Sequence, residues 1–594
     1  MQGVHMLRTI ITTVLLLVTS GLLAQDAETS DTIIVTATRT DISLADATIP
    51  VEIITRDEIE LSLASDLAEL LRFEAGIEIG RNGGPGQATS IFLRGTESNH
   101  TLVLLDGVRI NPGTLGGAAV QNIAPEMIER VEIVKGARSA LYGTDALGGV
   151  INIITRRAAK SYGEVSIGGG SFESQSTTLA FGRSGAAAEF GVSVNLNDSN
   201  GFPPRTDSDL ERGYENTTAN LHGGLKFGNS FVSLRHWTAT GKTEYLDFFL
   251  SPLDQDFENR STSIEVRSDF TDAIESRLIV GQMVDDITQN QSGDFVESER
   301  VSFDWQVSIA TDAHVLTGGL YYVDEDAASF SFGSGFDENT ISRAVFLQDQ
   351  WTHGRHQTFV AARLSNHETF GNETTWNAEY AFTAGENWTF QAGLGRAFRA
   401  PDATDRFGYG GNPDLSPEIG NEAQLGARYS RGGPNSVSLE IYRNKIDDLI
   451  EFDLATFELR NIALAQIRGA ELTWDFRGDG FSVRASLIKQ RAEDTTDNVR
   501  LLRRAEESAT LSAIRNIGLH KIGLSMLASG AREDFGGVKL PGYAVFNLTG
   551  EIAVGRDWRI NLRIENLFDR QYETAAGFRM QELSGFAELR YSWR

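Results

Sequence analysis

The sequence predicts a large all-β barrel in a membrane, preceded by a compact α+β domain, because the pattern of apolar and polar residues changes once along the chain. Between residues 91 and 157, short apolar runs are bounded by Gly, Asp or Asn, which is typical of strands joined by tight turns. From Tyr162 onward, apolar and polar residues alternate many times, so each predicted strand has one apolar and one polar face. After Ala24 we find no apolar stretch long enough for a spanning helix, which leaves a soluble exported protein or a barrel.

Residues 1–24 are predicted to be a signal peptide. Arg8 precedes an apolar run from Ile10 to Leu23, and Ala24 supplies a small residue for cleavage. An uncleaved membrane anchor is the alternative. The run is short, however, for the roughly 20 residues that span a bilayer, and polar, acidic sequence follows it. We therefore expect export.

Residues 25–40 form a polar segment that is interrupted by the β-branched run Asp31–Ala37. Taken alone, this run predicts a strand without a partner nearby, and such an edge can accept a strand of another chain. Pairing within the following domain is the alternative. The run is therefore a candidate partner site.

The next domain, 41–158, mixes element types. Val51–Ile54 predicts a strand, and the apolar positions near Leu67–Leu71 recur at helical spacing. Asn82–Gln87 predicts a loop. A dinucleotide-binding motif is excluded here because a third Gly is missing at the required spacing and the next element is a strand.

The barrel prediction covers 159–594. The clearest alternation puts Trp558, Ile560, Leu562 and Ile564 on one face and Arg559, Asn561, Arg563 and Glu565 on the other. A soluble sheet also alternates, but a soluble sandwich rarely needs so long a chain. These residues supply roughly 20 residues per strand to a barrel of about 22 antiparallel strands, a size whose lumen is plugged.

Composition excludes several functions. The net charge of -28, from 81 acidic and 53 basic residues, argues against a nucleic-acid partner. The absence of cysteine removes thiolate catalysis, cysteine-ligated zinc and disulfides. The nine histidines show no metalloprotease spacing, and no other catalytic set emerges, so we expect no enzyme and no cofactor required for chemistry.

Several blocks carry a family resemblance. In order, they are Ile91–Thr96, Leu102–Arg109, Glu129–Gly143 and Gly148–Thr155, followed by Arg399–Pro401, Gly410–Glu418, Asn566–Asp569 and Tyr572. The first four resemble the plug domain of TonB-dependent outer-membrane transporters. The later ones resemble the long extracellular loop and the penultimate strand of that family.

The resemblance implies a barrel in the bacterial outer membrane with an α+β plug inside its lumen. It also implies active uptake powered by the periplasmic protein TonB. In the family, a segment at the place of the β-branched run is the TonB box, here Asp31, Thr32, Ile33, Ile34, Val35, Thr36 and Ala37. We expect a monomer whose outer face contacts outer-membrane lipid.

Within the family, the chain is most similar to cobalamin receptors, through the run at 31–37, the Gly83–Gly84 loop, Arg443–Ile450 and Leu501–Ala505. A siderophore or haem receptor is the nearest alternative, because these receptors share most of the framework. A passive porin and a barrel enzyme such as a lipase are alternatives from other classes. The resemblance implies these ligand contacts: Ala88, Ser90, Glu97, Leu115, Gly116, Arg503 and Phe535.

Two further sets of residues are candidates. An acidic set in the early barrel loops contains Asp207, Asp209, Asp247, Asp254 and Asp256. Oxygen ligands on irregular loops suit calcium, and the resemblance also implies calcium here, although a solvated acidic loop is the alternative. In the family, Arg and Glu residues pair between plug and wall, which implies pairs among Arg94, Arg138, Glu422 and Glu471. Independent surface pairs are the alternative.

Overall fold

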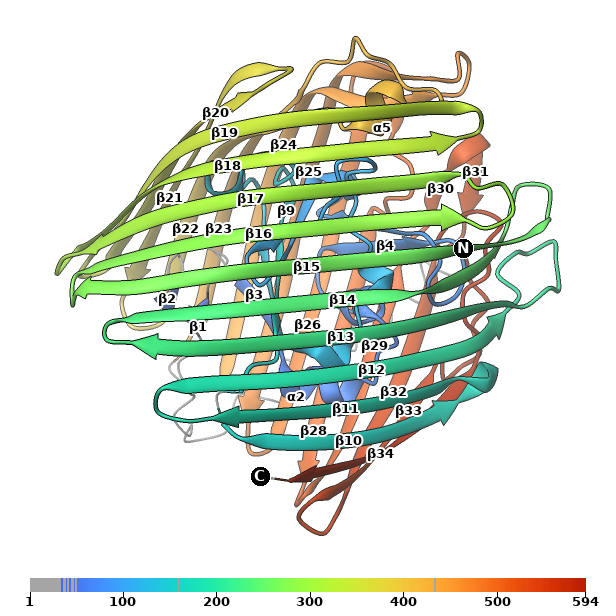
Figure 1. Ribbon diagram of the computed structural model, residues 1–594, viewed down its shortest axis with the longest axis horizontal. Helices are drawn as coiled ribbons and strands as arrows, with labels where there is room; N and C mark the ends of the chain where they lie inside the picture. The colour runs from blue at the N-terminus through green and yellow to red at the C-terminus, as the bar shows by residue number, and fades with distance from the viewer. Residues whose placement is uncertain are drawn as a thin grey trace.

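The computed structural model describes residues 34–35, 39, 42–43, 48, 51–158, 160–431 and 434–593. The predicted signal peptide lies outside the described residues, as do Asp31, Thr32, Ile33, Thr36 and Ala37. Figure 1 shows two parts: a wall of long strands, and a smaller set of elements in blue enclosed by that wall. None of the described helices is long and apolar enough to cross a membrane.

The enclosed domain, the plug, is built on a five-stranded sheet in the order β3-β8-β9-β6-β7. β6 and β9 are parallel, and the other pairs are antiparallel. Its strands are β3 (Val51–Thr55), β4 (Ile77–Arg81), β5 (Thr89–Leu93), β6 (Thr101–Leu105), β7 (Val108–Arg109), β8 (Ile128–Lys135) and β9 (Gly149–Thr155). Its helices are α2 (Arg56–Ser62), α3 (Leu67–Leu71), η2 (Ser98–His100), η3 (Val120–Asn122), η4 (Pro125–Met127) and α4 (Ser139–Tyr142). Before it, β1 (Ile34–Val35) pairs with β2 (Ile42–Ser43).

Local sequence explains the plug helices. Thr55 begins α2 through a capping box with Glu58, and the Asp66 side chain accepts the Glu69 backbone N–H at 2.9 Å to begin α3. Leu67 and Leu71 are fully buried in the apolar core between these helices and the sheet. The plug therefore has a core of its own.

The wall is a closed antiparallel barrel of 22 strands, in which the short β27 belongs to a hairpin connection. Its first half comprises β10 (Tyr162–Gly170), β11 (Gln175–Ser184), β12 (Ala188–Phe202), β13 (Arg212–Phe227), β14 (Ser230–Leu246), β15 (Pro252–Thr271), β16 (Ile274–Gln289), β17 (Phe295–Ala310), β18 (His314–Ser331), β19 (Ser334–His353) and β20 (His356–His367). Its second half comprises β21 (Gly371–Ala384), β22 (Trp388–Arg399), β23 (Glu418–Ser430), β24 (Asn435–Asp453), β25 (Glu458–Gly478), β26 (Phe481–Asp494), β28 (Glu507–Ile517), β29 (His520–Ser529), β32 (Tyr543–Val554), β33 (Trp558–Glu565) and β34 (Ser584–Trp593). The barrel closes where β10 pairs with β34, with Val165 opposite Tyr591.

Short elements occupy the connections between the wall strands. They are η5 (Ser171–Glu173), α5 (Ala403–Phe407), β27 (Val499–Arg500), β30 (Arg532–Asp534), η6 (Phe535–Gly537) and β31 (Val538–Leu540). The two ends of the barrel differ. At the short-turn end, connections such as 228–229 and 272–273 have two residues, whereas at the long-loop end 203–211 and 400–417 are much longer.

Alternation sets the two faces of the wall, as predicted. On β33, Leu562 points outward and is 41% exposed, while its neighbour Arg563 points to the plug and is 3% exposed. Apolar side chains therefore cover the outside, and polar side chains line the lumen. The predicted fold class, a transmembrane barrel with an α+β plug, is confirmed.

Candidate functional site

The predicted ligand contacts gather at the long-loop end. Ser90 lies on the β4–β5 hairpin opposite Gly80, and Ala88 lies exposed at its tip. Arg503 packs against this hairpin, since a Cβ atom added at Gly80 would lie 3.8 Å from its Cδ. The Arg503 guanidinium is 5.3 Å from the ring centroid of Phe535. These four predicted residues therefore share one region.

Glu97 belongs to the same region. It precedes η2, and its carboxylate pairs with Arg504, the residue after Arg503. The Arg504 guanidinium lies 4.3 Å from the Phe92 ring centroid. Glu97 therefore holds a wall loop against the plug, and its charge is compensated by Arg504.

Leu115 and Gly116 lie on the other side of η2, because Asn99 of that helix is within 2.9 Å of a Cβ atom added at Gly116. Leu115 is 49% exposed. Gly116 has φ +68°, and its carbonyl accepts the Asn111 side-chain amide at 2.8 Å. This turn therefore presents an apolar side chain outward, on backbone that favours glycine.

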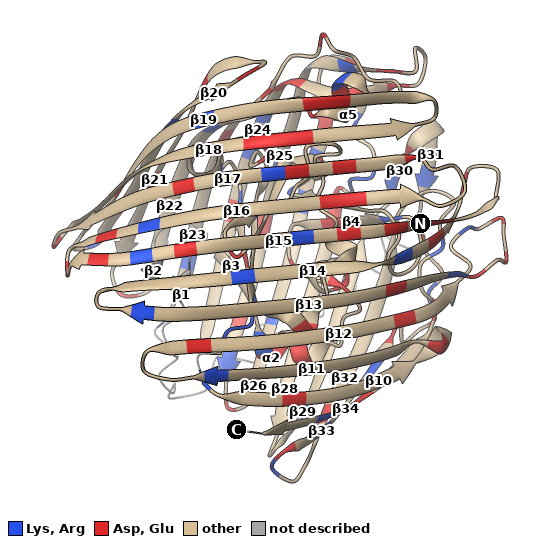
Figure 2. Cartoon of the chain, in the orientation of Figure 1, with Lys and Arg blue, Asp and Glu red and all other residues tan. Residues whose placement is uncertain are grey.

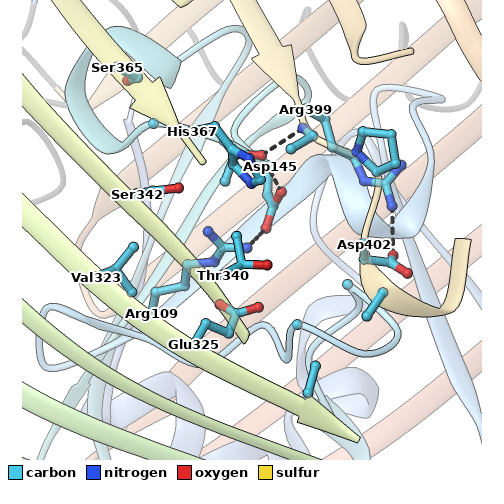
Figure 3. Close-up of a pocket in the computed structure, with 18 of the residues that line it drawn as sticks. Arg109, Asp145, Val323, Glu325, Thr340, Ser342, Ser365, His367, Arg399 and Asp402 are labelled. Atoms are coloured by element: carbon cyan, nitrogen blue, oxygen red, sulfur yellow. Dashed lines mark hydrogen bonds and ion pairs between the residues drawn. The ribbon is translucent and has the colours of Figure 1, made fainter. Parts of the chain in front are cut away.

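A cavity of about 90 Å³ lies beside this turn, between the plug and strands β18, β19, β20 and β22. Figure 3 shows Arg109 paired with Asp145, and Arg399 paired with Asp402 at 2.7 Å. Burial, and secondarily the neighbouring Asp405, raise the pKa of Asp402 well above its ordinary range. Sequence analysis missed this cavity, because its lining comes from four wall strands, the connection after β22 and two separate plug segments.

The seam between plug and wall is ionic. Arg94 pairs with Glu440 and also lies 4.0 Å from Glu422 and 3.9 Å from Glu471. Its guanidinium is 4.5 Å from the Tyr442 ring centroid. The structure thus brings together three of the four residues predicted for the seam, and it adds Glu440 as the nearest partner.

Arg138, the fourth predicted residue, pairs with Glu379 at 2.9 Å. Glu471 instead binds Lys135 at 2.7 Å, and Lys135 also binds Glu52 at the same distance. Glu422 accepts the Ala137 backbone N–H. The sequence could have indicated that Glu440 faces the lumen, because it is one of the polar residues of an alternating strand. It could not have indicated which plug residue Glu440 pairs with, because that depends on strand register around the barrel.

The N-terminal segment reaches the wall through Arg39. Its Nη2 lies 2.8 Å from Asp304, and its Nε donates to the Leu141 carbonyl at 2.5 Å. Of the predicted TonB box, only the backbones of Ile34 and Val35 are described, in the two-residue pairing with β2. Arg39 therefore anchors the chain just after the box to both the plug and the wall.

The five predicted calcium ligands are not gathered into one site. Within the described residues, no group of three or more His, Asp or Glu side chains could hold a metal ion. Asp207 and Asp209 pair with different arginines, Arg205 at 3.2 Å and Arg579 at 3.7 Å. Asp247 accepts backbone N–H groups of its own turn, while Asp254 and Asp256 share the Asn290 amide.

Two family models match the chain. One described as "TonB-dependent Receptor Plug Domain" matches residues 43–150, and one described as "TonB dependent receptor-like, beta-barrel" matches residues 157–567. The chain belongs to the TonB-dependent receptor family. It is therefore an outer-membrane protein of a family of transporters and receptors that work with TonB, and the predicted family and location are confirmed. The long-loop end of the receptor faces outward and the short-turn end faces the periplasm.

Curated relatives resemble the receptor over 94% or more of its length. "Vitamin B12 transporter BtuB" of Photobacterium profundum is 28% identical over 97% of both chains. The protein of the same name from Vibrio vulnificus is 29% identical over 94% of both, and that from Vibrio cholerae is 27% identical over 97% of both.

Solved structures share the fold at lower identity. The copper transporter OprC is 16% identical with a TM-score of 0.80, covering 91% of this chain and 99% of its own. The FrpB iron transporter from Neisseria meningitidis is 14% identical with a TM-score of 0.80 and the same coverage. A mutant of the ferric enterobactin receptor PfeA from Pseudomonas aeruginosa is 16% identical with a TM-score of 0.79, covering 91% and 98%. At such identity the likeness is one of fold.

Proposed function

We propose that the receptor takes up cobalamin or a related corrinoid across the outer membrane by TonB-coupled active transport. The observation that carries this proposal is the match to relatives named vitamin B12 transporters, which extends over 94% or more of each chain. The outward grouping of Ala88, Ser90, Glu97, Arg503 and Phe535 supports it, because a ligand must first bind on the outward side of the plug.

Cyanocobalamin binding to the detergent-purified receptor tests the cargo. We expect tight binding, weakened by Arg503→Gln, which would remove the cation beside Phe535. Arg500→Gln is a matched control, because Arg500 lies three residues away and is 43% exposed. If the wild-type receptor does not bind cyanocobalamin, the cargo proposal fails and siderophore or haem compounds become the ligands to test.

The same titration with and without calcium tests the acidic set. We propose that calcium draws the loops bearing Asp207, Asp209 and Asp247 together, since carboxylate oxygens on irregular loops match its coordination. Stronger cyanocobalamin binding with calcium, lost in Asp209→Asn, supports this. Equal binding in both conditions contradicts it.

We propose that TonB captures the segment 31–37 by strand pairing and pulls on it. β1 and β2 pair over only two residues each, so little backbone pairing has to be exchanged. Arg39 follows the segment and binds Asp304 of the wall and Leu141 of the plug, so a pull reaches the seam directly.

Val35→Pro tests this coupling. Proline removes a backbone donor, so we expect uptake of cyanocobalamin to be lost while its binding is unchanged. Val35→Ala is the control because it keeps the N–H group. Normal uptake by the proline variant would contradict capture by strand pairing.

We further propose that the receptor works as a monomer surrounded by outer-membrane lipid. Outward residues such as Leu347, Leu364 and Leu425 are 55%, 58% and 62% exposed, which suits contact with acyl chains. Native mass spectrometry from a lipid nanodisc should give a single 65.0 kDa chain, less any cleaved signal peptide. A dimer would contradict the proposal.

A further inference from the structure

A second cavity, of about 330 Å³, lies between the plug and β14–β17. Its wall residues are close to two-residue turns: Arg235 follows the turn 228–229, while Arg267 and Arg277 flank the turn 272–273. Figure 2 shows basic segments on β14, β15 and β16 toward the end of the barrel where these short turns lie. The cavity therefore lies in the periplasmic half of the receptor, away from the outward ligand contacts.

Its lining is basic although the whole chain is acidic. The charged residues of the lining are Arg39, Arg130, Arg157, Arg235, Arg267 and Arg277 against Asp106, Glu129 and Asp304. In a chain with a net charge of -28, twice as many arginines as carboxylates face this one space. Such a concentration attracts anions.

Three wall arginines converge on the carboxylate of Glu265. Glu265 lies 3.5 Å from Arg235, 3.4 Å from Arg267 and 2.8 Å from Arg277. Arg235 also pairs with Asp106 of the plug, and Arg267 lies 3.7 Å from Glu275. The three guanidiniums therefore converge around Glu265, and each presents five donors in a fork suited to oxyanions.

Arg157 adds a fourth cation on the plug side. Within the part of the chain that the structure describes, it has no ion pair or side-chain hydrogen bond. Arg157 is exposed to the space of the cavity, and the repulsion of nearby Arg235 disfavours its charged form. An anion in the cavity would relieve this repulsion.

We propose that this cavity binds an oxyanion group, a phosphate or a carboxylate, between Arg157 of the plug and the Arg235, Arg267 and Arg277 side chains of the wall. Two sources share this chemistry: a free anion from the periplasm, or an anionic group of the cargo as it leaves. Only the second source rests on the proposed function. Guanidiniums bind such groups by charge-assisted, often bidentate, hydrogen bonds.

Calorimetric titration of the purified, full-length receptor with inorganic phosphate, without cargo, tests the site. We expect saturable binding to the wild-type receptor and a roughly ten-fold loss of affinity in Arg157→Gln, the equivalent of one charge-assisted hydrogen bond. Arg157 has no partner to lose among the described residues, so this variant should fold normally. Arg277→Gln gives an independent second loss. Arg355→Gln, at the exposed turn between β19 and β20, is the control with the same charge change.

The outcomes separate the proposals. If phosphate does not bind the wild-type receptor, or binds all variants equally, the site does not exist, whatever the cargo is. If Arg157→Gln weakens phosphate binding and leaves cyanocobalamin uptake unchanged, the site serves a free anion. If the variant also slows uptake while outward cyanocobalamin affinity stays the same, the site serves the departing cargo.

Discussion

The plug core and the plug–wall seam are both buried, yet they are built from opposite chemistry. Leu67 and Leu71 pack in an apolar core, whereas Arg94 and Lys135 meet carboxylates of the wall. Water can replace a lost ionic partner when two faces separate, but it cannot replace apolar contacts. The difference teaches that the plug can stay folded by its own apolar core, whereas its contacts with the wall are of a kind that water can replace.

Of the substitutions considered, Arg94→Gln is expected to weaken the plug–wall seam most. Among the described residues, it leaves Glu440 and Glu471 buried with Lys135 as their one nearby cation, so plug retention should weaken by about 4 kcal/mol. Protease sensitivity of the plug in the purified receptor measures this. The control is Arg468→Gln, because that side chain is 57% exposed. An unchanged digestion pattern would show that these ion pairs do not hold the plug.

Leu71→Ala tests the apolar core of the plug. Its side chain is fully buried, and the cavity left behind should lower the free energy of plug unfolding by about 3 kcal/mol. Denaturant unfolding followed by a label on the plug measures the change. Leu425→Ala, on the lipid-facing side of β23, should leave the plug transition where it is. If both variants behave alike, the plug has no separate core.

The pH dependence at Glu74 should be smaller. This plug carboxyl lies 3.5 Å from Arg484, yet burial outweighs that partner and raises its pKa to about 7. The folded state therefore binds the proton more tightly than the unfolded state, so plug stability should fall as pH rises from about 4.5 to about 7. Thermal melts of the wild-type receptor and Glu74→Gln across this range measure it. A variant with the same slope as the wild type would exclude Glu74 as the source.

Asp57→Ala is expected to have the smallest effect. Asp57 reaches across the seam to Lys521 at 3.2 Å, but it is 80% exposed. Solvent screens such a pair, so its loss should cost less than about 1 kcal/mol. The protease assay used for Arg94 should show no change. A large effect here would mean that solvent-exposed seam pairs also retain the plug.

Local patterns predicted most of the fold. The helical spacing near Leu67–Leu71 matches α3, the run Val51–Ile54 matches β3, and the alternation around Leu562 matches an outward apolar face. These features depend only on residues close in the sequence, or on the two-residue alternation of a strand. The short helix α2 was not predicted, although its capping pair, Thr55 and Glu58, was visible in the sequence.

The site was predictable only where family motifs mark it. Arg503 and Phe535 came from the resemblance, and the structure places them together. Glu379 and Asp304, by contrast, are partners chosen by strand register around a closed barrel, which no local pattern encodes. The basic cavity has the same origin, since its arginines are far apart in the chain.

Barrel closure has a consequence for how the chain assembles. Because Val165 pairs with Tyr591, one edge of the first wall strand, β10, stays unpaired until the last residues of the chain have been made. The plug, by contrast, pairs strands that are all present within the first 155 residues. Its contacts carry a much smaller loop-closure entropy, so they can form early, while the final wall contact is a slow, late event. A truncation that removes β34 should thus leave a plug able to fold beside a sheet that cannot close.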